Sequence, residues 1–333
     1  VLEFRGRVPS RMAILVLIGT LLSHLGGGSV GREGTAVQMG ASLARSLGKL
    51  PWRWLRLTRS RQRMLLMAGV SAGFGSLFGT PVAGTVFGME CIAVGKLHYE
   101  GLLICAAASF VGDGVCRWLG AFLQVHHGRF HPEALAMSLP LALKLALFAL
   151  PVALVAGGFS EGTQRLARWT KAHFANPFLR ALLGGIAIIA LALAFRSTAF
   201  LNLGTPWLPR VFEGAGAVPS WAFAAKFLFT VVTLGFGYKG GEVTPLFVIG
   251  SLMGASLAPV LGLPVPFIAA IGFIAVFAAA SNTPIASTLM GVELFGAGFA
   301  GPLVITCFLA YILVGHRGIY GAHRISTSKQ LHT

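Results

Sequence analysis

Two glutamates that follow glycine-rich turns are the residues of this chain best placed to do chemistry. Glu33 lies within Gly31–Thr35 (GREGT), and Glu242 lies within Gly240–Thr244 (GGEVT). Each turn precedes an apolar run that we expect to be a helix. The first N–H groups of a helix have no partner within the helix, and the helix dipole adds positive charge there. Both turns are therefore predicted to bind an anion through the backbone.

At the first turn, Glu33 stands beside the predicted anion site and could occupy that site itself. Protonation would neutralise the carboxylate and release the site, which would link a proton to an anion. The alternative is a glutamate that only caps a helix start. A carboxylate inside a membrane is costly and this arrangement occurs twice, so we favour the functional interpretation. The first site is predicted to use Gly31 and Arg32 with the N–H groups of Gly34, Thr35 and Ala36.

The second turn repeats the arrangement with its own donors. Gly240 and Gly241 form the turn, and Pro245 near the helix start has no N–H to lose. Lys239 either adds positive charge or extends to the membrane interface, and both interpretations stay open. The hydroxyls of Thr35 and Thr244 either donate to the anion or bond their own backbone. The N–H groups expected here are those of Val243, Thr244 and Leu246.

A longer element also occurs twice, as residues 78–90 and 281–293. Thr, Pro, Ala, Thr, Gly and Glu recur at the same spacing in both copies. Each copy ends in a glutamate, Glu90 or Glu293, which we expect to cap a helix or to pair near a helix end. Lys144 and Lys226 lie within apolar stretches, where we expect them to be paired or to extend toward the interface. Repeats of broken apolar helices are typical of transporters that bind substrate between the repeats.

The composition indicates a polytopic membrane protein. Hydrophobic residues make up 55% of the chain, charged residues make up 11%, and the mean hydropathy is +0.78. The net charge of +16 lies mostly in short connections, such as the stretch 53–63. Membrane topology and anionic headgroups explain that charge better than nucleic acid does, and the positive-inside rule would make this stretch cytoplasmic.

Other chemistry is not indicated. Gly26–Gly31 matches G-x-G-x-x-G but follows an apolar helix rather than a strand, so it fails as a dinucleotide site. His126, His127 and His131 are expected to be solvated, and the four cysteines lack metal-ligand spacing. With no nucleophile–base pair, we expect no enzyme activity, no metal and no cofactor.

The apolar segments define the expected organisation. Residues 1–123 are interpreted as the remainder of a first transmembrane repeat, 124–136 as a linker, 137–326 as a second repeat and 327–333 as a polar tail. The second copy has more helix ahead of its Glu-x-Thr element than the first, so we expect N-terminal helices to precede Val1. The predicted apolar segments are 11–28, 36–48, 64–78, 81–95, 100–123, 137–158, 178–195, 220–237, 243–262, 266–280, 284–299 and 301–315.

These motifs resemble the CLC family of chloride channels and proton-coupled anion antiporters. Gly31–Gly34 matches the gating-glutamate motif of that family, and Gly240–Pro245 matches its second glycine-rich anion-binding loop. Tyr320, which we place at the start of a last short helix, matches the tyrosine that members contribute to the central anion site. The likeness runs from about residue 10 to about 326. It implies an all-α membrane protein, an inverted repeat with re-entrant helices, and a homodimer in the bacterial inner membrane.

Departures from the chloride branch favour the branch that exports fluoride. Thr35 replaces the usual proline, Tyr238-Lys239 and Glu242 differ from the chloride-type loop, and Cys91 stands where chloride/proton antiporters carry an inner glutamate. The resemblance implies fluoride/proton antiport with Glu33 as proton carrier and gate. A chloride/proton antiporter or voltage-gated chloride channel is the first alternative. A truncated, non-transporting membrane protein is another, because the family's first anion-binding loop would precede Val1.

Overall fold

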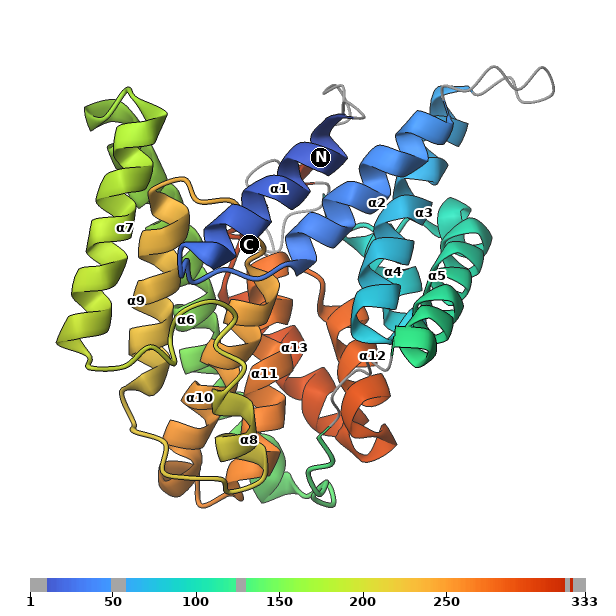
Figure 1. Cartoon of the computed structure of the whole chain (residues 1–333). Helices are drawn as coiled ribbons and strands as arrows, with labels where there is room; N and C mark the ends of the chain where they lie inside the picture. The colour runs from blue at the N-terminus through green and yellow to red at the C-terminus, as the bar shows by residue number, and fades with distance from the viewer. Residues whose placement is uncertain (1–10, 49–57, 124–129, 321–323, 326–333) are drawn as a thin grey trace, which may run out of the picture.

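The computed structural model describes residues 11–48, 58–123, 130–320 and 324–325, and helices dominate it (Figure 1). This confirms the all-α class; the only strands in the described ranges are β1 (Ala93–Val94) and β2 (Arg324–Ile325), which pair in parallel. The α-helices are α1 (Arg11–Leu25), α2 (Glu33–Leu47), α3 (Arg59–Phe78), α4 (Pro81–Glu90), α5 (Leu102–Leu123), α6 (Leu139–His173), α7 (Pro177–Ala194), α8 (Trp207–Phe212), α9 (Ala222–Gly235), α10 (Val243–Leu261), α11 (Val265–Ser281), α12 (Pro284–Phe295) and α13 (Ala300–Leu313). Short 3₁₀ turns η1 (Tyr99–Gly101) and η2 (Ala297–Phe299) precede α5 and α13.

The duplicated sequence element folds in the same way in both copies. α3 ends at Gly79 and α11 ends at Asn282, each with a left-handed backbone (φ 66° and 59°). The next residue is a threonine, and a proline then opens α4 or α12 at the first helical position. Proline is favoured there because its fixed φ suits the helix and its missing N–H costs nothing. The Thr-Pro motif therefore sets a sharp turn between two helices in each repeat.

Helix packing also repeats. α2 packs on α3, α10 packs on α11, and α4 of the first copy packs against α12 of the second. Gly40 meets Gly69 where α2 crosses α3, and Gly250 meets Gly272 where α10 crosses α11; a Cβ at any of them would overlap the opposite backbone. Small residues let helix backbones approach closely in membrane proteins. These paired glycines give the two repeats equivalent cores.

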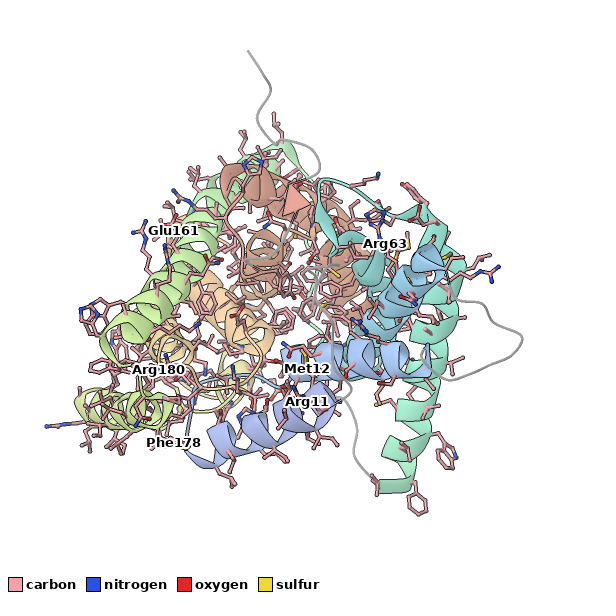
Figure 2. All side chains as sticks on the ribbon, turned by 90° about the horizontal axis from the view of Figure 1, so that it is seen from above. Arg11, Met12, Arg63, Glu161, Phe178 and Arg180 are labelled. Atoms are coloured by element: carbon pink, nitrogen blue, oxygen red, sulfur yellow. The ribbon has the colours of Figure 1, made fainter. Side chains whose placement is uncertain are left out.

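Only some of the helices can cross a bilayer alone. Within the described ranges, four have the length and apolarity needed, namely the spans Tyr99–Leu123, Leu139–His173, Pro177–Ala194 and Val243–Leu261. α7 directs its apolar side chains outward, with Phe178 84% exposed, and Phe178 and Arg180 lie at the edge of the molecule in Figure 2. By contrast, α10 and α11 are almost wholly buried. Of the shorter apolar helices, α11 agrees with the prediction of broken helices held inside protein, whereas α1 exposes apolar side chains such as Ile14 and Leu22.

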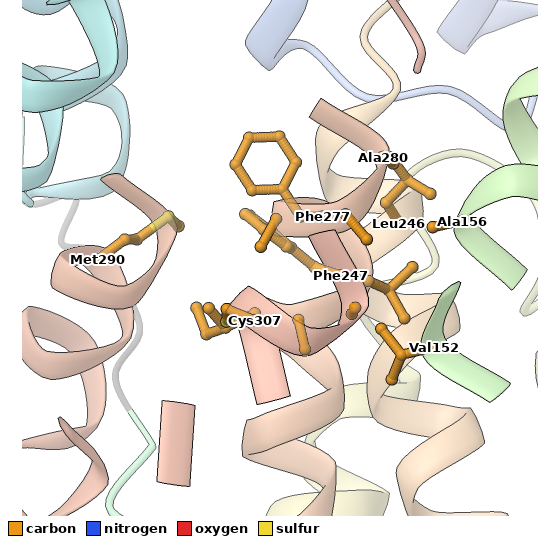
Figure 3. Packing of buried hydrophobic residues seen from close by; sticks show 14 of the residues in the cluster. Val152, Ala156, Leu246, Phe247, Phe277, Ala280, Met290 and Cys307 are labelled. Carbon is orange, nitrogen blue, oxygen red and sulfur yellow. The ribbon is translucent and has the colours of Figure 1, made fainter. Parts of the chain in front are cut away.

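The buried centre packs α10 and α11 against the long helix α6. Phe247 and Phe273 stack with ring centroids 4.2 Å apart, and Phe247 also meets Phe277 edge-on at 5.2 Å. Figure 3 shows the side chains of Val152, Ala156, Leu246, Phe247, Phe277, Ala280, Met290 and Cys307 within this cluster. The N-terminal end of α10 is thereby fixed by packing on several sides.

The structure corrects two expectations about elements. The apolar segment predicted at 137–158 is only the first part of a longer helix, because α6 continues through polar residues to His173. Tyr320 does not begin a helix in the described residues; it follows α13 in an irregular segment. The predicted tail 327–333 and residues 124–129 of the predicted linker, with His126 and His127, lie outside the described residues. So do residues 53–57 of the basic stretch 53–63.

Candidate functional site

The two glycine-rich turns, 209 to 210 residues apart in the chain, lie directly against each other. The Gly31 N–H donates to the Gly241 carbonyl at 2.7 Å, and the Gly241 N–H donates to the Gly31 carbonyl at 2.6 Å. This antiparallel bridge brings the N-terminal ends of α2 and α10 together. The two anion-binding turns predicted from the repeat therefore form one site.

Glycine is required at Gly241 because other backbone comes so close. A Cβ on Gly241 would lie 2.7 Å from the Gly34 nitrogen, 2.9 Å from the Glu33 nitrogen and 3.0 Å from Glu33 Oε2. A Cβ on Gly31 would overlap the same carboxylate oxygen. Side chains at these positions would thus fill the space beside the helix start, which is reserved here for the Glu33 carboxylate and backbone N–H groups.

Glu33 opens α2, but its carboxylate lies at the start of α10. Oε1 accepts a hydrogen bond from the Thr244 hydroxyl, and Oε2 accepts one from the Thr244 N–H at 3.3 Å. The side chain is only 2% exposed. A negative group at a helix N-terminus is stabilised by free N–H groups and by the dipole. The Glu33 carboxylate therefore sits where the N-terminus of α10 would attract an anion.

The donor inventory differs in part from the prediction. The Ala36 N–H is not free, because it donates to the Arg32 carbonyl at 3.1 Å, and the Leu246 N–H donates to the Glu242 carbonyl at 3.1 Å. Both lie at the fourth position, where the helix already supplies an acceptor. The start of α2 has no side-chain cap. Gly34 and Thr35 remain in the first turn of α2 as predicted donors.

Other predicted residues have distinct surroundings. The Thr35 hydroxyl is 2.6 Å from the Thr20 hydroxyl of α1, so it ties two helices together, which neither of the two interpretations anticipated. Arg32 and Lys239 are exposed, and the Lys239 backbone N–H donates to Ser23 Oγ at 3.1 Å. Gly240 packs against Val30, where a Cβ would collide with the valine side chain.

Glu242 and Tyr320 approach the same region from the second repeat. Glu242 immediately precedes α10, with Val243 and Thr244 in the first turn. Tyr320 packs against the buried centre around α10 and α11, and Glu242 and Cys91 are close enough to act on its hydroxyl electrostatically. The structure thus brings Tyr320 to the Glu242 side of the site.

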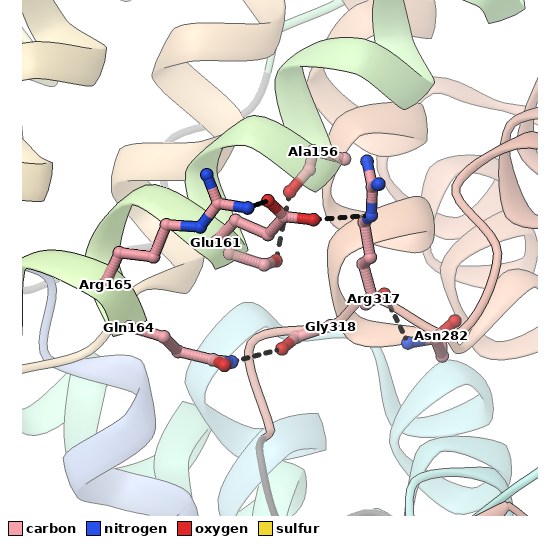
Figure 4. A network of polar contacts seen from close by, with 8 residues as sticks. Ala156, Glu161, Gln164, Arg165, Asn282, Arg317 and Gly318 are labelled. Atoms are coloured by element: carbon pink, nitrogen blue, oxygen red, sulfur yellow. Dashed lines mark hydrogen bonds and ion pairs between the residues drawn. The ribbon is translucent and has the colours of Figure 1, made fainter. Parts of the chain in front are cut away.

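A polar network holds the segment that carries Tyr320 (Figure 4). Glu161 on α6 binds Arg317 at 2.6 Å and Arg165 at 2.6 Å. Gln164 Nε2 donates to the Gly318 carbonyl at 2.9 Å, and the Ile319 N–H donates to the Ala280 carbonyl at 2.9 Å. The polar end of α6, which sequence apolarity missed, therefore fixes this segment.

Glu90 and Glu293 each cap the opposite helix. Glu90 accepts from the N–H groups of Ile285 (3.1 Å) and Ala286 (2.8 Å) at the start of α12. Glu293 accepts from those of Val82 (3.0 Å) and Ala83 (2.7 Å) at the start of α4. Their expected role as pairing or capping groups is confirmed, and the reciprocity shows that α4 and α12 run antiparallel.

One polar cluster beside the site was not predicted as a unit. Ser29, four residues before Glu33, contacts Lys226, Thr230 and Thr233 of α9. These three α9 residues stand at positions i, i+4 and i+7, which share one helix face. That polar face on an otherwise apolar helix is the sequence signal that could have revealed the cluster.

Comparison with known proteins agrees with this geometry. The family described as voltage gated chloride channel matches residues 1–315. A protein of Pseudomonas syringae pv. tomato named "Chloride/fluoride channel protein" is 42% identical over 328 residues, covering 97% of this chain and 71% of the relative. A more distant relative, an "H(+)/Cl(-) exchange transporter" of Yersinia pestis, is 24% identical over 90% of this chain and 65% of its own length.

Solved structures share the fold. The crystal structure of a CLC-type fluoride/proton antiporter superposes with a TM-score of 0.87 and 36% identity, covering 93% of this chain and 76% of the other. A slow cyanobacterial Cl⁻/H⁺ antiporter gives a TM-score of 0.77 at 20% identity, with 96% of this chain and 78% of that chain covered, which supports the fold alone. The chain therefore belongs to the CLC family of voltage-gated chloride channels, whose members are multi-pass membrane proteins.

Proposed function

We propose that this protein exchanges fluoride for protons across the membrane and so exports fluoride. The observation that carries the proposal is the Glu33 carboxylate held by Thr244 at the N-terminus of α10. Glu33 and an anion would compete for the same donors. A carboxylate that leaves when protonated, and returns when it loses its proton, couples the two ions.

The exchange follows from the two protonation states of Glu33. When ionised, the carboxylate occupies the start of α10 and excludes the anion. When protonated, its attraction to the helix N-terminus falls, because the neutral acid interacts weakly with the dipole. An anion then binds the N–H groups of Val243 and Thr244. Glu33 carries its proton across the membrane in the direction opposite to the anion and releases it there.

The preference for fluoride rests on the loop chemistry. Tyr320 brings a phenol hydroxyl to the Glu242 side of the site, where it packs on the buried centre. Hydroxyl groups are compact donors suited to a small, strongly hydrated anion. Cys91 is buried, and the neighbouring Glu90 is occupied with α12, so neither supplies the inner carboxylate of a chloride/proton exchanger. The relatives named for fluoride are the more similar ones at 42% and 36% identity.

Chloride transport on the same fold is the second candidate. The Yersinia relative is named for proton/chloride exchange, and the Pseudomonas relative is named for both halides. The Glu33 arrangement would serve either anion. The choice therefore depends on a flux measurement with both ions.

A homodimer in the bacterial inner membrane, with one pathway per subunit, completes the proposal. α5 exposes Phe110, Val111, Trp118 and Phe122. The membrane-spanning segment Tyr99–Leu123 that contains it is only 17% buried within a single subunit. α13 also exposes apolar side chains. Cysteine cross-linking at Trp118 should capture a dimer at lipid dilutions where a monomeric membrane protein is not captured.

The test is anion efflux from liposomes that hold the purified protein, followed with fluoride, chloride and pH electrodes. Fluoride efflux with opposed proton movement and little chloride is expected. Equal or greater chloride flux would assign the chloride alternative. Absence of both fluxes from folded protein would favour the non-transporting alternative.

A further inference from the structure

Lys226 is a fully buried lysine in the middle of an apolar helix, with 0% of its surface exposed. Its Nζ donates to the Phe200 carbonyl at 3.0 Å, the Asn202 carbonyl at 2.7 Å and Ser29 Oγ at 2.8 Å. The residue does not extend to the interface. Burying an amine this way is costly, so its partners explain why it is tolerated.

The hydrogen-bond directions favour the charged form of the amine. Thr230 gives its only hydroxyl proton to the Lys226 backbone carbonyl at 2.9 Å. It must therefore accept from Ser29 Oγ, 2.9 Å away, and that leaves Ser29 Oγ as the acceptor for Nζ. Carbonyls only accept, so Nζ donates three times. Three N–H donors define the ammonium form, since a neutral amine has two.

The ammonium group of Lys226 forms no ion pair with a carboxylate in the described residues. Glu33 is the acidic group whose field acts on it. Ser29, held by the ammonium and by Thr233 through its N–H at 3.1 Å, lies four residues before Glu33 on the turn that bridges to Gly241. Lys226 therefore bears on Glu33 both through this turn and through space.

We propose that Lys226 is a positioning residue that anchors the Ser29–Glu33 turn and supplies the buried positive charge against which Glu33 releases and regains its proton. The inference rests on the proposed function in taking Glu33 as the proton carrier. A fixed cation favours the ionised carboxylate, and the apolar surroundings of α9 weaken its screening.

Four other ionisable groups lie on the segments that adjoin Glu33. His24 on α1 has both ring nitrogens buried without a hydrogen-bond partner. It interacts electrostatically with Glu33, Arg32 and Lys226. Arg32 and Lys239 are exposed and screened by solvent. Glu242 immediately precedes α10 and, when ionised, is negatively charged, unlike Lys226. Lys226 differs from all of these in being a fully buried, fully hydrogen-bonded cation.

The test is an infrared titration of the Glu33 carboxyl in purified, lipid-reconstituted protein, with the band assigned by its loss in Glu33→Gln. Lys226→Met should move the half-protonation of this band to higher pH by about one unit. Lys226→Arg keeps the charge, so its half-protonation pH should stay close to that of the wild type. Should Lys226→Met fail to fold, Lys226→Gln is the second neutral variant, since its amide still donates to the two carbonyls.

Lys144→Met is the matched control. Lys144 also lies in an apolar helix, but its Nζ is 3.5 Å from the Gly262 carbonyl, just past the end of α10 opposite Thr244. The 19 residues of α10 separate these ends by about 28 Å. This variant should leave the Glu33 band unshifted.

The anchoring of the Ser29–Glu33 turn by Lys226 is tested separately, with Ser29→Ala. Ser29→Ala keeps the charge but removes the hydroxyl that joins Lys226 to the turn. Faster hydrogen exchange at the Gly31 N–H is expected, with the Glu33 band unmoved.

A folded Lys226→Met protein with an unshifted band would overturn the inference. The titration needs no transport, so a protein that moves no fluoride would refute the proposed function and still decide the role of Lys226. In transport, the pH optimum of fluoride flux should be higher for Lys226→Met than for the wild type.

Discussion

At the scale of single residues, the site depends on a carboxylate that starts one helix and caps another. Glu33 belongs to α2 by sequence, yet its oxygens bind Thr244 of α10. Sequence identified both turns because glycine, glutamate and threonine recur around them. It could not show that the turns meet, since the Gly31–Gly241 bridge joins residues more than 200 positions apart. Nor could it count the free N–H groups, so Ala36 was assigned wrongly.

Thr244→Val should lower the KM for fluoride by about ten-fold. A hydrogen bond to a charged group contributes about 1.5–3 kcal/mol, so losing the hydroxyl weakens the hold on Glu33 while the backbone donor stays for the anion. Concentration-dependent fluoride flux measures this. Thr306→Val, which loses only a bond to the Pro302 carbonyl in α13, should leave KM unchanged. A raised KM in Thr244→Val would mean that the hydroxyl serves the anion more than Glu33.

Gly241→Ala should reduce fluoride flux to below about one-tenth. Its methyl group would press on the Gly34 and Glu33 nitrogens at 2.7 and 2.9 Å, and such overpacking costs about 1–3 kcal/mol. Gly158→Ala is the control, because its methyl would lie 3.8 Å from Phe227 Cζ, an ordinary contact. Flux and thermal unfolding are measured on both proteins. Normal flux in Gly241→Ala would contradict the close approach of the two turns.

At the scale of elements, each of the short helices α4 and α12 is stabilised at its N-terminus by a glutamate of the other. Glu90 and Glu293 cap α12 and α4 across the repeat boundary. The ends of these helices were predictable to within a few residues, because Thr-Pro fixes their starts. Their reciprocal pairing was not predictable, since a glutamate at a helix end has many conceivable partners. α8, only six residues long, gave too short a pattern to be expected at all.

Glu293→Ala should destabilise the protein by about 1–2 kcal/mol, because two N–H groups at the start of α4 lose their acceptors and the dipole loses its counter-charge. Glu90→Ala should cost at least as much, since Glu90 is more buried. Thermal unfolding in detergent checks both. Glu161→Ala, which removes two solvent-exposed ion pairs instead, should cost less. The reverse order would contradict the capping role.

Arg317→Gln should speed hydrogen exchange at the Ile319 N–H, which bonds the Ala280 carbonyl. The Arg317–Glu161 pair links the Tyr320 segment to α6, and an exposed pair contributes up to about 1 kcal/mol. Arg165→Gln is the matched control: it removes an ion pair to the same glutamate that lies within α6. Equal exchange in the two variants would show that Arg317 does not hold the segment.

At the scale of the whole molecule, the fold combines two similar repeats around a site between them. Apolar runs and the repeated motifs predicted this arrangement, because lipid requires long apolar surfaces and broken helices must lie inside protein. The polar extension of α6 and the buried ammonium of Lys226 were beyond such reasoning. Both depend on which residues meet in space. The polar face of α9 is visible in the sequence, but it does not show which residues Lys226 would contact.

The most direct measurement of the central claim is proton movement driven by a fluoride gradient in liposomes, compared between wild type and Glu33→Gln. The wild type should move protons against their own gradient as fluoride flows the opposite way. Glu33→Gln cannot carry the proton, so it should pass fluoride without proton movement or not at all. Intact proton-coupled exchange in Glu33→Gln would contradict the role assigned to Glu33 and the mechanism built on it.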